Sequence, residues 1–459
     1  MLATKNQLHT PTKSVFMNRR AYPRTIFATV WLALCVVPSG RADTNTHDAA
    51  EWRVQKGQAS LADYLRYAAA HNAGLEAAFN RWQAALERIA QRESLPNPRF
   101  TFAHFVEEVE TRVGPQTQRF GLVQPYPWFG KLKLRGQVAG SEAEVAFQQY
   151  EATRAELFFD LKKAYFEYGF LYRAISITED NIQLLDHLEA VARSKLKAGA
   201  SQAGVLKAQV ELGKLDDRLK SLRDLRGPLM SRLNATLNRP HDAELAWPKD
   251  VQPSDVVLDE AALFERLDRT NPELGALQSQ IGKAEHVVAL ARKAYYPDLA
   301  FGLDYVVTDD ALMANVPDSG KDPIVAMITL DIPIWRGAYR AGVTEARFAL
   351  EAAGNARLDH GNRAEAELTL ALYRVRDAER KIDLYRDTLV PQADQALKIA
   401  ETVYRSGKGD FLDLIDAERL LLEFQLAAER AFADREIALA EIEKLIGAPI
   451  IGDPLKTGD

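Results

Sequence analysis

The stretch Val205-Leu206-Lys207-Ala208-Gln209 returns later in the chain as Leu414-Ile415-Asp416-Ala417-Glu418, at an offset of 209 residues. Other pairs keep a similar offset: Pro240 with Pro449, Asn72 with Asn271, Leu75 with Leu274, and Phe100 with Phe301. An offset that drifts slightly is what two diverged copies with loops of unequal length produce. We therefore interpret residues 60–240 and 259–449 as two copies of one long structural unit, joined by a linker at 241–258.

Each copy contains the same unusual order of elements: a long helix, two short strands, a very long helix and another long helix. In the first copy, a helix over residues 61–94 ends at Leu95-Pro96-Asn97-Pro98, and strands follow at 99–106 and 117–126. The second copy repeats this order, with a helix at 260–295 and strands at 298–307 and 324–332.

The strands alternate cleanly between apolar and small or polar residues. Leu299, Phe301 and Leu303 lie on one face, whereas Gly302 and Asp304 lie on the other. In a soluble protein the apolar face would meet a core. The strand length also suits a tilted transmembrane strand, and a barrel wall is apolar outside and polar inside. The alternation alone fits both interpretations.

A proline corner follows each strand pair. The first is Gln124-Pro125-Tyr126-Pro127-Trp128-Phe129-Gly130-Lys131, and the second is Ile332-Pro333-Ile334-Trp335-Arg336-Gly337. Proline ends a ladder of strand hydrogen bonds and redirects the chain. The aromatic residues fit a membrane–water boundary, and they equally fit ordinary packing where a strand meets a helix.

The helices after the corners are too long for a compact core. Residues 131–197 contain no proline, which predicts a helix of roughly 100 Å. Apolar residues step by four and three along it, as in a coiled-coil seam, and the last helix keeps this spacing at Leu414, Ala417 and Leu421. Such helices must pack as hairpins or against other chains.

Two glycine-containing turns mark the ends of the predicted hairpins. They are Lys197-Ala198-Gly199-Ala200-Ser201 and Ser406-Gly407-Lys408-Gly409-Asp410. Glycine suits the end of one helix, and Ser201 and Asp410 suit the cap of the next.

Composition and motifs argue against several classes of function. The net charge of −6 disfavours a nucleic-acid partner. The eight histidines show no metal-ligand spacing, and the chain has no glycine-rich phosphate loop, His–carboxylate cluster or nucleophile motif. We therefore expect no enzymatic activity, no cofactor and no metal centre.

The N-terminal residues 1–42 are typical of a secretory signal peptide. Three arginines precede an apolar run at 26–37, and small residues place the cleavage after Ala42, with either Met1 or Met17 as the start. The run is too short for a membrane anchor. Leu34 precedes Cys35, which argues against a lipoprotein signal, and removing the signal leaves no cysteine. Residues 43–59 would be an N-terminal extension and 450–459 a tail.

The turns and the first corner resemble those of the TolC-like outer membrane factor family. Tyr404-Arg405-Ser406-Gly407 followed by Asp413-Leu414-Ile415-Asp416-Ala417 is similar to the second turn of that family. Gly199 followed by Val205-Leu206-Lys207-Ala208-Gln209 is similar to its first turn. The corner from Gln124 to Lys131, with Arg135 and Ala139 after it, is similar to the heavy-metal efflux branch.

The resemblance covers about residues 60–449 and implies a mainly α fold with a small β part. Three protomers would each lend four strands to one β-barrel in outer-membrane lipid. Their helical hairpins would form a periplasmic α-barrel that meets an adaptor protein and an inner-membrane efflux pump. The expected function is a passive exit duct for heavy-metal cations. The alternatives are a duct for drugs or other organic solutes, and a soluble periplasmic coiled-coil scaffold.

Asp413 and Asp416 are the candidates for a pore constriction. They share a helix face, and threefold symmetry would make two acidic rings that favour cations. First-turn aspartates also simply offset a helix dipole. In the first copy, the residues around Gly199 include no matching acids.

Tyr404, Arg405 and Lys408 are candidates for joining the hairpin turns or for contacting the adaptor. The alternative is that they are ordinary solvated residues at a helix end. Gly199 and Gly407 belong to the same candidate contact region, although the sharp turn itself is reason enough for glycine there.

Overall fold

The structure is a computed structural model that describes residues 60–199, 201–248 and 256–450. The predicted signal peptide (1–42), the extension (43–59) and nearly all of the predicted tail lie outside the described residues. Among the helices in the described ranges, none is both long and apolar enough to cross a membrane.

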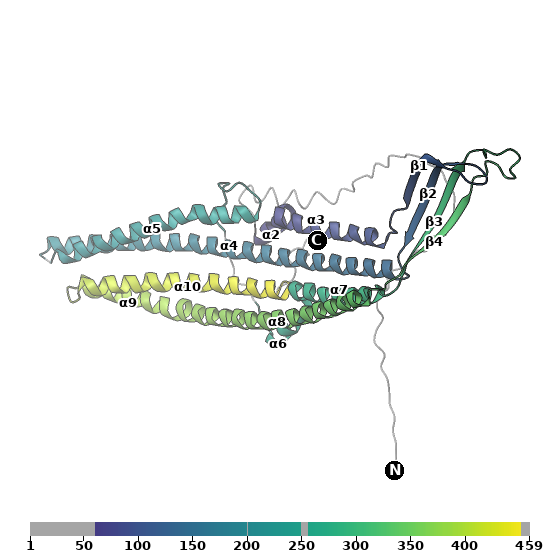
Figure 1. Ribbon diagram of the computed structural model, residues 1–459. Coiled ribbons are helices and arrows are strands. Elements are labelled where there is room, and N and C mark those ends of the chain that lie inside the picture. Colours follow the sequence, from purple (N-terminus) through teal and green to yellow (C-terminus); the bar gives the residue numbers. More distant parts are fainter. Residues whose placement is uncertain (1–59, 200, 249–255, 451–459) are drawn as a thin grey trace, which may run out of the picture. The chain divides into compact units, whose positions relative to one another are not determined.

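Two similar series of elements follow each other along the chain (Figure 1). The first is α2 (Leu61–His71), α3 (Ala73–Glu93), β1 (Arg99–Val109), β2 (Gln116–Tyr126), α4 (Lys131–Lys197) and α5 (Ala203–Thr236). The second is α6 (Glu260–Thr270), α7 (Pro272–Lys293), β3 (Asp298–Thr308), β4 (Ile324–Asp331), α8 (Arg336–Ile382), the π-helix η1 (Asp383–Leu389), α9 (Val390–Arg405) and α10 (Phe411–Ile446). The predicted mainly α fold with paired hairpins and four strands is confirmed.

The four strands form one antiparallel sheet in the order β1-β2-β3-β4. The central pair joins the two halves of the chain, with Phe120 opposite Tyr305 and Leu122 opposite Leu303. The face that carries these residues is apolar and largely exposed; Phe100, for example, is 69% exposed. No element among the described residues covers this face with a core.

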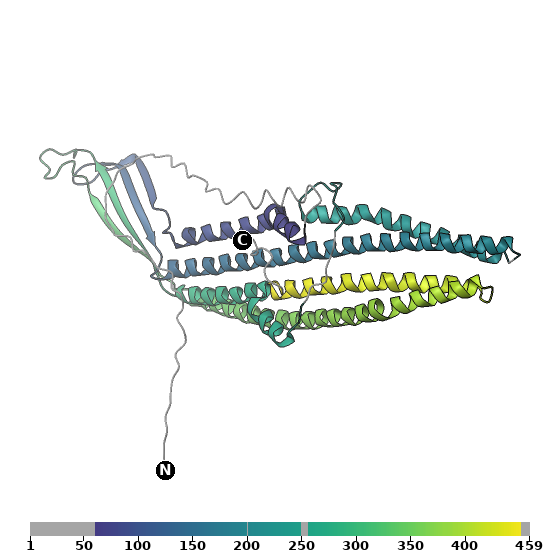
Figure 2. The ribbon, with the colours of Figure 1, turned by 180° about the vertical axis from the view of Figure 1, so that it is seen from behind.

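The helices pack side by side in two pairs (Figures 1 and 2). α4 pairs with α5 to form hairpin 1, α9 pairs with α10 to form hairpin 2, and α10 also lies along α4. A buried apolar cluster drawn from all four helices lies between the hairpins, and it includes Leu188, Leu397 and Leu414. α4 has 67 residues and begins and ends where the sequence predicted.

Both helices that precede the strands are interrupted, where the sequence predicted one continuous helix each. Asn72 separates α2 from α3, and Asn271 separates α6 from α7. Each asparagine has extended backbone angles, and its Oδ1 caps the following helix by accepting from the N–H of Leu75 or Leu274. At the second site, Pro272 adds to the break because a residue before proline disfavours the helical conformation.

A second interruption lies between α8 and α9. The N–H of Val390 donates to the carbonyl of Tyr385, five residues back, so η1 is a π-helical segment. Pro391 follows at the start of α9 and lacks an N–H. The wider π-helical turn just before Pro391 accommodates the hydrogen-bond donor that proline lacks. The helical pattern of the sequence alone did not predict this turn.

We predict that Asn271→Ala destabilises the fold by about 1–3 kcal/mol, because it removes a helix cap and a buried hydrogen bond together. Its Nδ2 donates to the carbonyl of Leu445 at the end of α10, at 2.8 Å. Asn72→Ala should lower stability similarly, since its Nδ2 donates to the carbonyl of Thr236 at 3.0 Å. Urea unfolding followed by helical circular dichroism measures both. Asn355→Ala on the exposed surface of α8 is the control, and equal stability of all three variants would contradict the prediction.

Candidate functional site

The candidate site is the pair of hairpin turns, which lie at the end of the helices remote from the sheet (Figures 1 and 2). Gly199 and Gly407 have φ values of 96° and 80°, in the left-handed region where a side chain would be strained. The N–H of Gly407 donates to the carbonyl of Tyr404 at 3.0 Å, which closes the second turn. Asp410 then caps α10 by accepting from the N–H of Leu412 at 3.2 Å.

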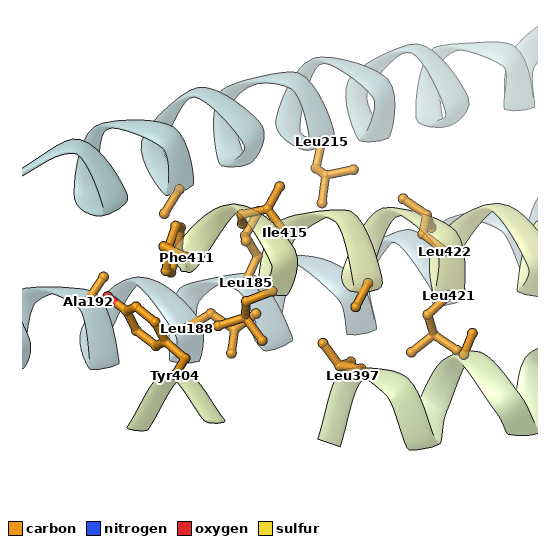
Figure 3. Close-up of a cluster of buried hydrophobic side chains, with 14 of the residues drawn as sticks. Leu185, Leu188, Ala192, Leu215, Leu397, Tyr404, Phe411, Ile415, Leu421 and Leu422 are labelled. Atoms are coloured by element: carbon orange, nitrogen blue, oxygen red, sulfur yellow. The ribbon is translucent and has the colours of Figure 1, made fainter. Parts of the chain in front are cut away.

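Tyr404 belongs to the interface between the hairpins rather than to the surface. It is 9% exposed, and its ring packs edge-on against Phe411 with the centroids 5.3 Å apart (Figure 3). The Nζ of Lys195, from hairpin 1, lies 4.9 Å from the centroid of the same ring. Burial raises the pKa of the Tyr404 hydroxyl, so it stays neutral.

Arg405 also joins the two hairpins within one chain. Its guanidinium lies 2.6 Å from Glu401 in hairpin 2 and 2.8 Å from Nε2 of His187 in hairpin 1. Lys408 differs from both, because it is exposed and its side chain has no partner among the described residues. Of the three predicted contact residues, Lys408 is the one whose side chain is free for another molecule.

Asp413 and Asp416 are exposed, while their neighbours Leu414, Ile415 and Ala417 are buried. The alternation follows the helical period, so both carboxylates lie outside the apolar cluster that holds the hairpins together. Asp416 has one described ionic neighbour, Arg419, at 3.4 Å. The structure therefore presents two carboxylates on adjacent turns at the start of α10.

A group that sequence reasoning missed lies one turn beyond them. Glu418 is 1% exposed, and its Oε1 has no hydrogen-bond partner. The pKa of this carboxyl is raised from 4.5 to about 7, mainly by burial and also by the nearby charge of Glu211, while Arg419 lowers it. A signal was available: Glu418 is four residues after Leu414 and three before Leu421, on the buried seam.

Glu211 and Arg419 form an ion pair between α5 and α10 beside Glu418. Glu211 also bonds Lys214 at 2.8 Å, and its pKa is lowered chiefly by the hydrogen bond from Arg419. The repeat places Gln209 at the position of Glu418, so the first copy has a neutral residue there. The interface thus combines a satisfied ion pair with one carboxyl that favours its protonated form.

Comparison with known proteins fits this geometry. The model of the outer membrane efflux protein family matches residues 263–448, which include the second strand pair and hairpin 2. Over these residues, which make up less than half of the chain, the protein is similar to this family. It is 26% identical over 340 residues to the outer membrane protein OprJ of Pseudomonas aeruginosa, covering 69% of this chain and 68% of OprJ.

Two further relatives extend the match over most of the chain. The cobalt-zinc-cadmium resistance protein CzcC of Cupriavidus metallidurans is 21% identical over 405 residues, covering 86% of this chain and 91% of CzcC. The crystal structure of CusC superposes with a TM-score of 0.73 at 15% identity, covering 86% of this chain and 94% of CusC. The fold is therefore that of the TolC-like channels.

We predict that Glu418→Gln stabilises the turn region at high pH and leaves it unchanged at low pH. The folded pKa lies above the ordinary value, so wild type loses stability as the pH rises from 4.5 through about 7, by up to about 3 kcal/mol. Hydrogen exchange of the first turns of α10 measures the effect. Exchange in the variant should be slower at about pH 8, by roughly tenfold or more, and equal to wild type at about pH 5.

The control is Glu423→Gln, which neutralises an exposed carboxylate on the same helix. If both variants show the same pH dependence as wild type, Glu418 does not titrate in this range and the prediction is wrong.

Proposed function

We propose that the protein is the outer-membrane exit duct of a tripartite efflux system and conducts its cargo passively. The observation that carries the proposal is the sheet. β1 and β4 each pair on one side only, and one face of the sheet is apolar and exposed. Lipid tolerates no open strand edge, because unpaired backbone groups cannot bond to water there.

Threefold assembly would pair the open strand edges and would also turn the apolar face towards lipid. Three copies of a four-stranded sheet give a closed barrel of twelve strands, with the apolar face towards lipid. A homotrimer of this kind would explain why the apolar face of the sheet meets no core among the described residues. A soluble periplasmic scaffold, the alternative from another class, would gain nothing from an exposed aromatic sheet face.

The opposite face of the sheet suits a water-filled lumen. Gly121, Gly302 and Asp304 lie on it, and Arg119 pairs with Asp304 across β2 and β3. A Cβ at Gly121 would lie 2.6 Å from Oδ1 of Asp304, so a larger residue there would displace the Asp304 side chain. Charged and small residues on this face agree with an aqueous passage.

The hairpin turns would meet the periplasmic adaptor, which in turn binds an inner-membrane pump. Lys408 is the strongest contact candidate because its side chain is exposed and unpartnered among the described residues. Tyr404 and Arg405 would act indirectly, by fixing hairpin 2 against hairpin 1. Gly199 and Gly407 would set the shape of the two turns. The signal peptide at residues 1–42 would direct export across the inner membrane.

Heavy-metal cations are the cargo that we propose. The first corner, from Gln124 to Lys131, carries the resemblance to the metal efflux branch, and the name of CzcC refers to cobalt, zinc and cadmium resistance. A duct for drugs or organic solutes is the second candidate, since the similarity to OprJ carries no reference to metals. Neither duct requires catalysis, because the pump would supply the energy.

Fractionation and mass together test the duct proposal. The expected result is a protein that stays in the outer-membrane fraction after high salt and alkali. In mild detergent, light scattering should then give roughly three times the mass of one mature chain. A soluble monomer or dimer would exclude the duct and would favour the alternative of a soluble periplasmic scaffold.

We predict that Asp413→Asn with Asp416→Asn lowers the preference for cations over anions by roughly threefold or more in single-channel recordings. The physical reason is that three copies would lose six carboxylates from two rings at the narrow end of the tunnel. The control variant is Asp216→Asn with Asp217→Asn, which removes the same charge from exposed positions on α5. Unchanged conductance and selectivity in the first variant would exclude these aspartates from the constriction.

A further inference from the structure

The two longest helical runs start at the sheet with the wrong charge for a helix N-terminus. α4 carries Lys131, Lys133 and Arg135 in its first five residues, and α8 carries Arg336 and Arg340. Neither helix has an acidic residue in its first turn. Because the N-terminal end of the helix dipole is positive, cations there are unfavourable unless another group compensates for them.

The other helices of the described chain show that this pattern is local to the sheet. α2, α3, α6, α7 and α10 each have an acidic residue in the first turn. α5 and α9 have none; over the first five residues α5 carries one cation, Lys207, and α9 carries none. Two or more cations at a helix start therefore occur, among the described helices, where a helix leaves the sheet.

Most of these cations have no partner within the chain. Lys131 is the exception, because its Nζ donates a hydrogen bond to Asp298 at 2.7 Å and holds the first corner against β3. Lys133, Arg135, Arg336 and Arg340 have no ion pair or side-chain hydrogen bond among the described residues. Within the same ranges, many cations of the helical hairpins do form ion pairs, as Arg173 does with Glu429 at 2.9 Å.

Arg92, in the last turn of α3, adds a fifth cation to this group. Arg92 and Arg135 line one open pocket together with Ser94 and Asn97, so donors from two helices converge there. Glu93 follows Arg92 in the chain; its side chain lies over Gly136, and it has no ion pair among the described residues. We call Arg92, Lys133, Arg135, Arg336 and Arg340 the basic collar.

Exposed apolar side chains directly precede the collar on both sides. Phe129 is 69% exposed beside α4, while Ile334 and Trp335 are 66% and 75% exposed beside α8. Trp128 is different, because it stacks on Tyr296 with the centroids 5.6 Å apart and so belongs to the packed corner. A step from exposed aromatic residues to unpaired cations matches the step from acyl chains to phosphates in a bilayer.

We propose that the basic collar is a binding surface for the phosphate groups of anionic phospholipids in the periplasmic leaflet of the outer membrane. This proposal rests on the proposed function, which places the sheet in that membrane. Charge complementarity identifies the headgroup, and the apolar residues identify it as a lipid rather than free phosphate. The bound phosphates would also compensate the charge at the starts of α4 and α8.

Native mass spectrometry of detergent-solubilised protein tests the proposal, with phosphatidylglycerol and phosphatidylcholine added separately. Wild type should retain phosphatidylglycerol in preference to phosphatidylcholine. The variant with Lys133, Arg135, Arg336 and Arg340 all changed to Gln should bind phosphatidylglycerol roughly tenfold more weakly or worse. Inorganic phosphate at millimolar concentration should not displace the lipid; displacement would mean a free-anion site instead.

Two further variants separate lipid recognition from charge and from folding. The control changes four exposed cations far from the sheet to Gln: Lys197, Lys207, Arg218 and Lys220. It should retain the lipid like wild type, as should a charge-conserving variant with Lys133→Arg, Arg135→Lys, Arg336→Lys and Arg340→Lys. If the neutral variant does not fold, the two double changes on α4 and on α8 replace it.

If the variant with four collar cations changed to Gln retains the lipid as well as wild type does, the collar does not bind lipid and the proposal is wrong. An equal loss in the collar variant and the control would overturn it too, since only net charge would then matter. The duct proposal has its own test, because a protein that is soluble in fractionation would exclude the duct. A trimer in the outer membrane without selective lipid retention would leave the duct intact and exclude the collar alone.

Discussion

The unpaired edges of a four-stranded sheet constrain the rest of this structure. Backbone N–H and C=O groups on the free sides of β1 and β4 need partners, and the apolar face needs a non-aqueous neighbour. A helix or loop from the same chain would satisfy both needs in a soluble domain. In this chain the long helices lead away from the sheet instead. In the proposed duct, other copies would pair the free edges and lipid would cover the apolar face.

The helices then obey a different constraint, because very long helices are stable only when packed along their length. α4 gains that packing from α5 on one side and α10 on another, and the cluster around Leu188 and Leu414 joins the two hairpins. Asn72 and Asn271 end the short helices against the last turns of α5 and α10. The two halves thus use the same side-chain device to fix equivalent ends.

Periodicity was enough to predict α4, the four strands and the position of both turns, since each depends on local patterns of apolar residues, glycine and proline. It was not enough for the breaks at Asn72 and Asn271, where the side-chain amides bond the carbonyls of Thr236 and Leu445, residues far away in the sequence. Only Pro272 after Asn271 was a local signal for one of them. Glu418 was missed for a similar reason. Its position on the seam is visible in the sequence, but its burial against α5 depends on how the hairpins cross.

The turn region combines features that strengthen and weaken the same interface. Tyr404 with Lys195 and the pair of Glu211 with Arg419 hold hairpin 2 against hairpin 1. Glu418 works against them whenever it is ionised, because its Oε1 has no hydrogen-bond partner. In the proposed duct, a tunnel end that opens and closes would need an interface whose two states differ by only a few kcal/mol. A buried carboxyl beside a satisfied ion pair lowers the stability of the packed state without removing the contacts that define it.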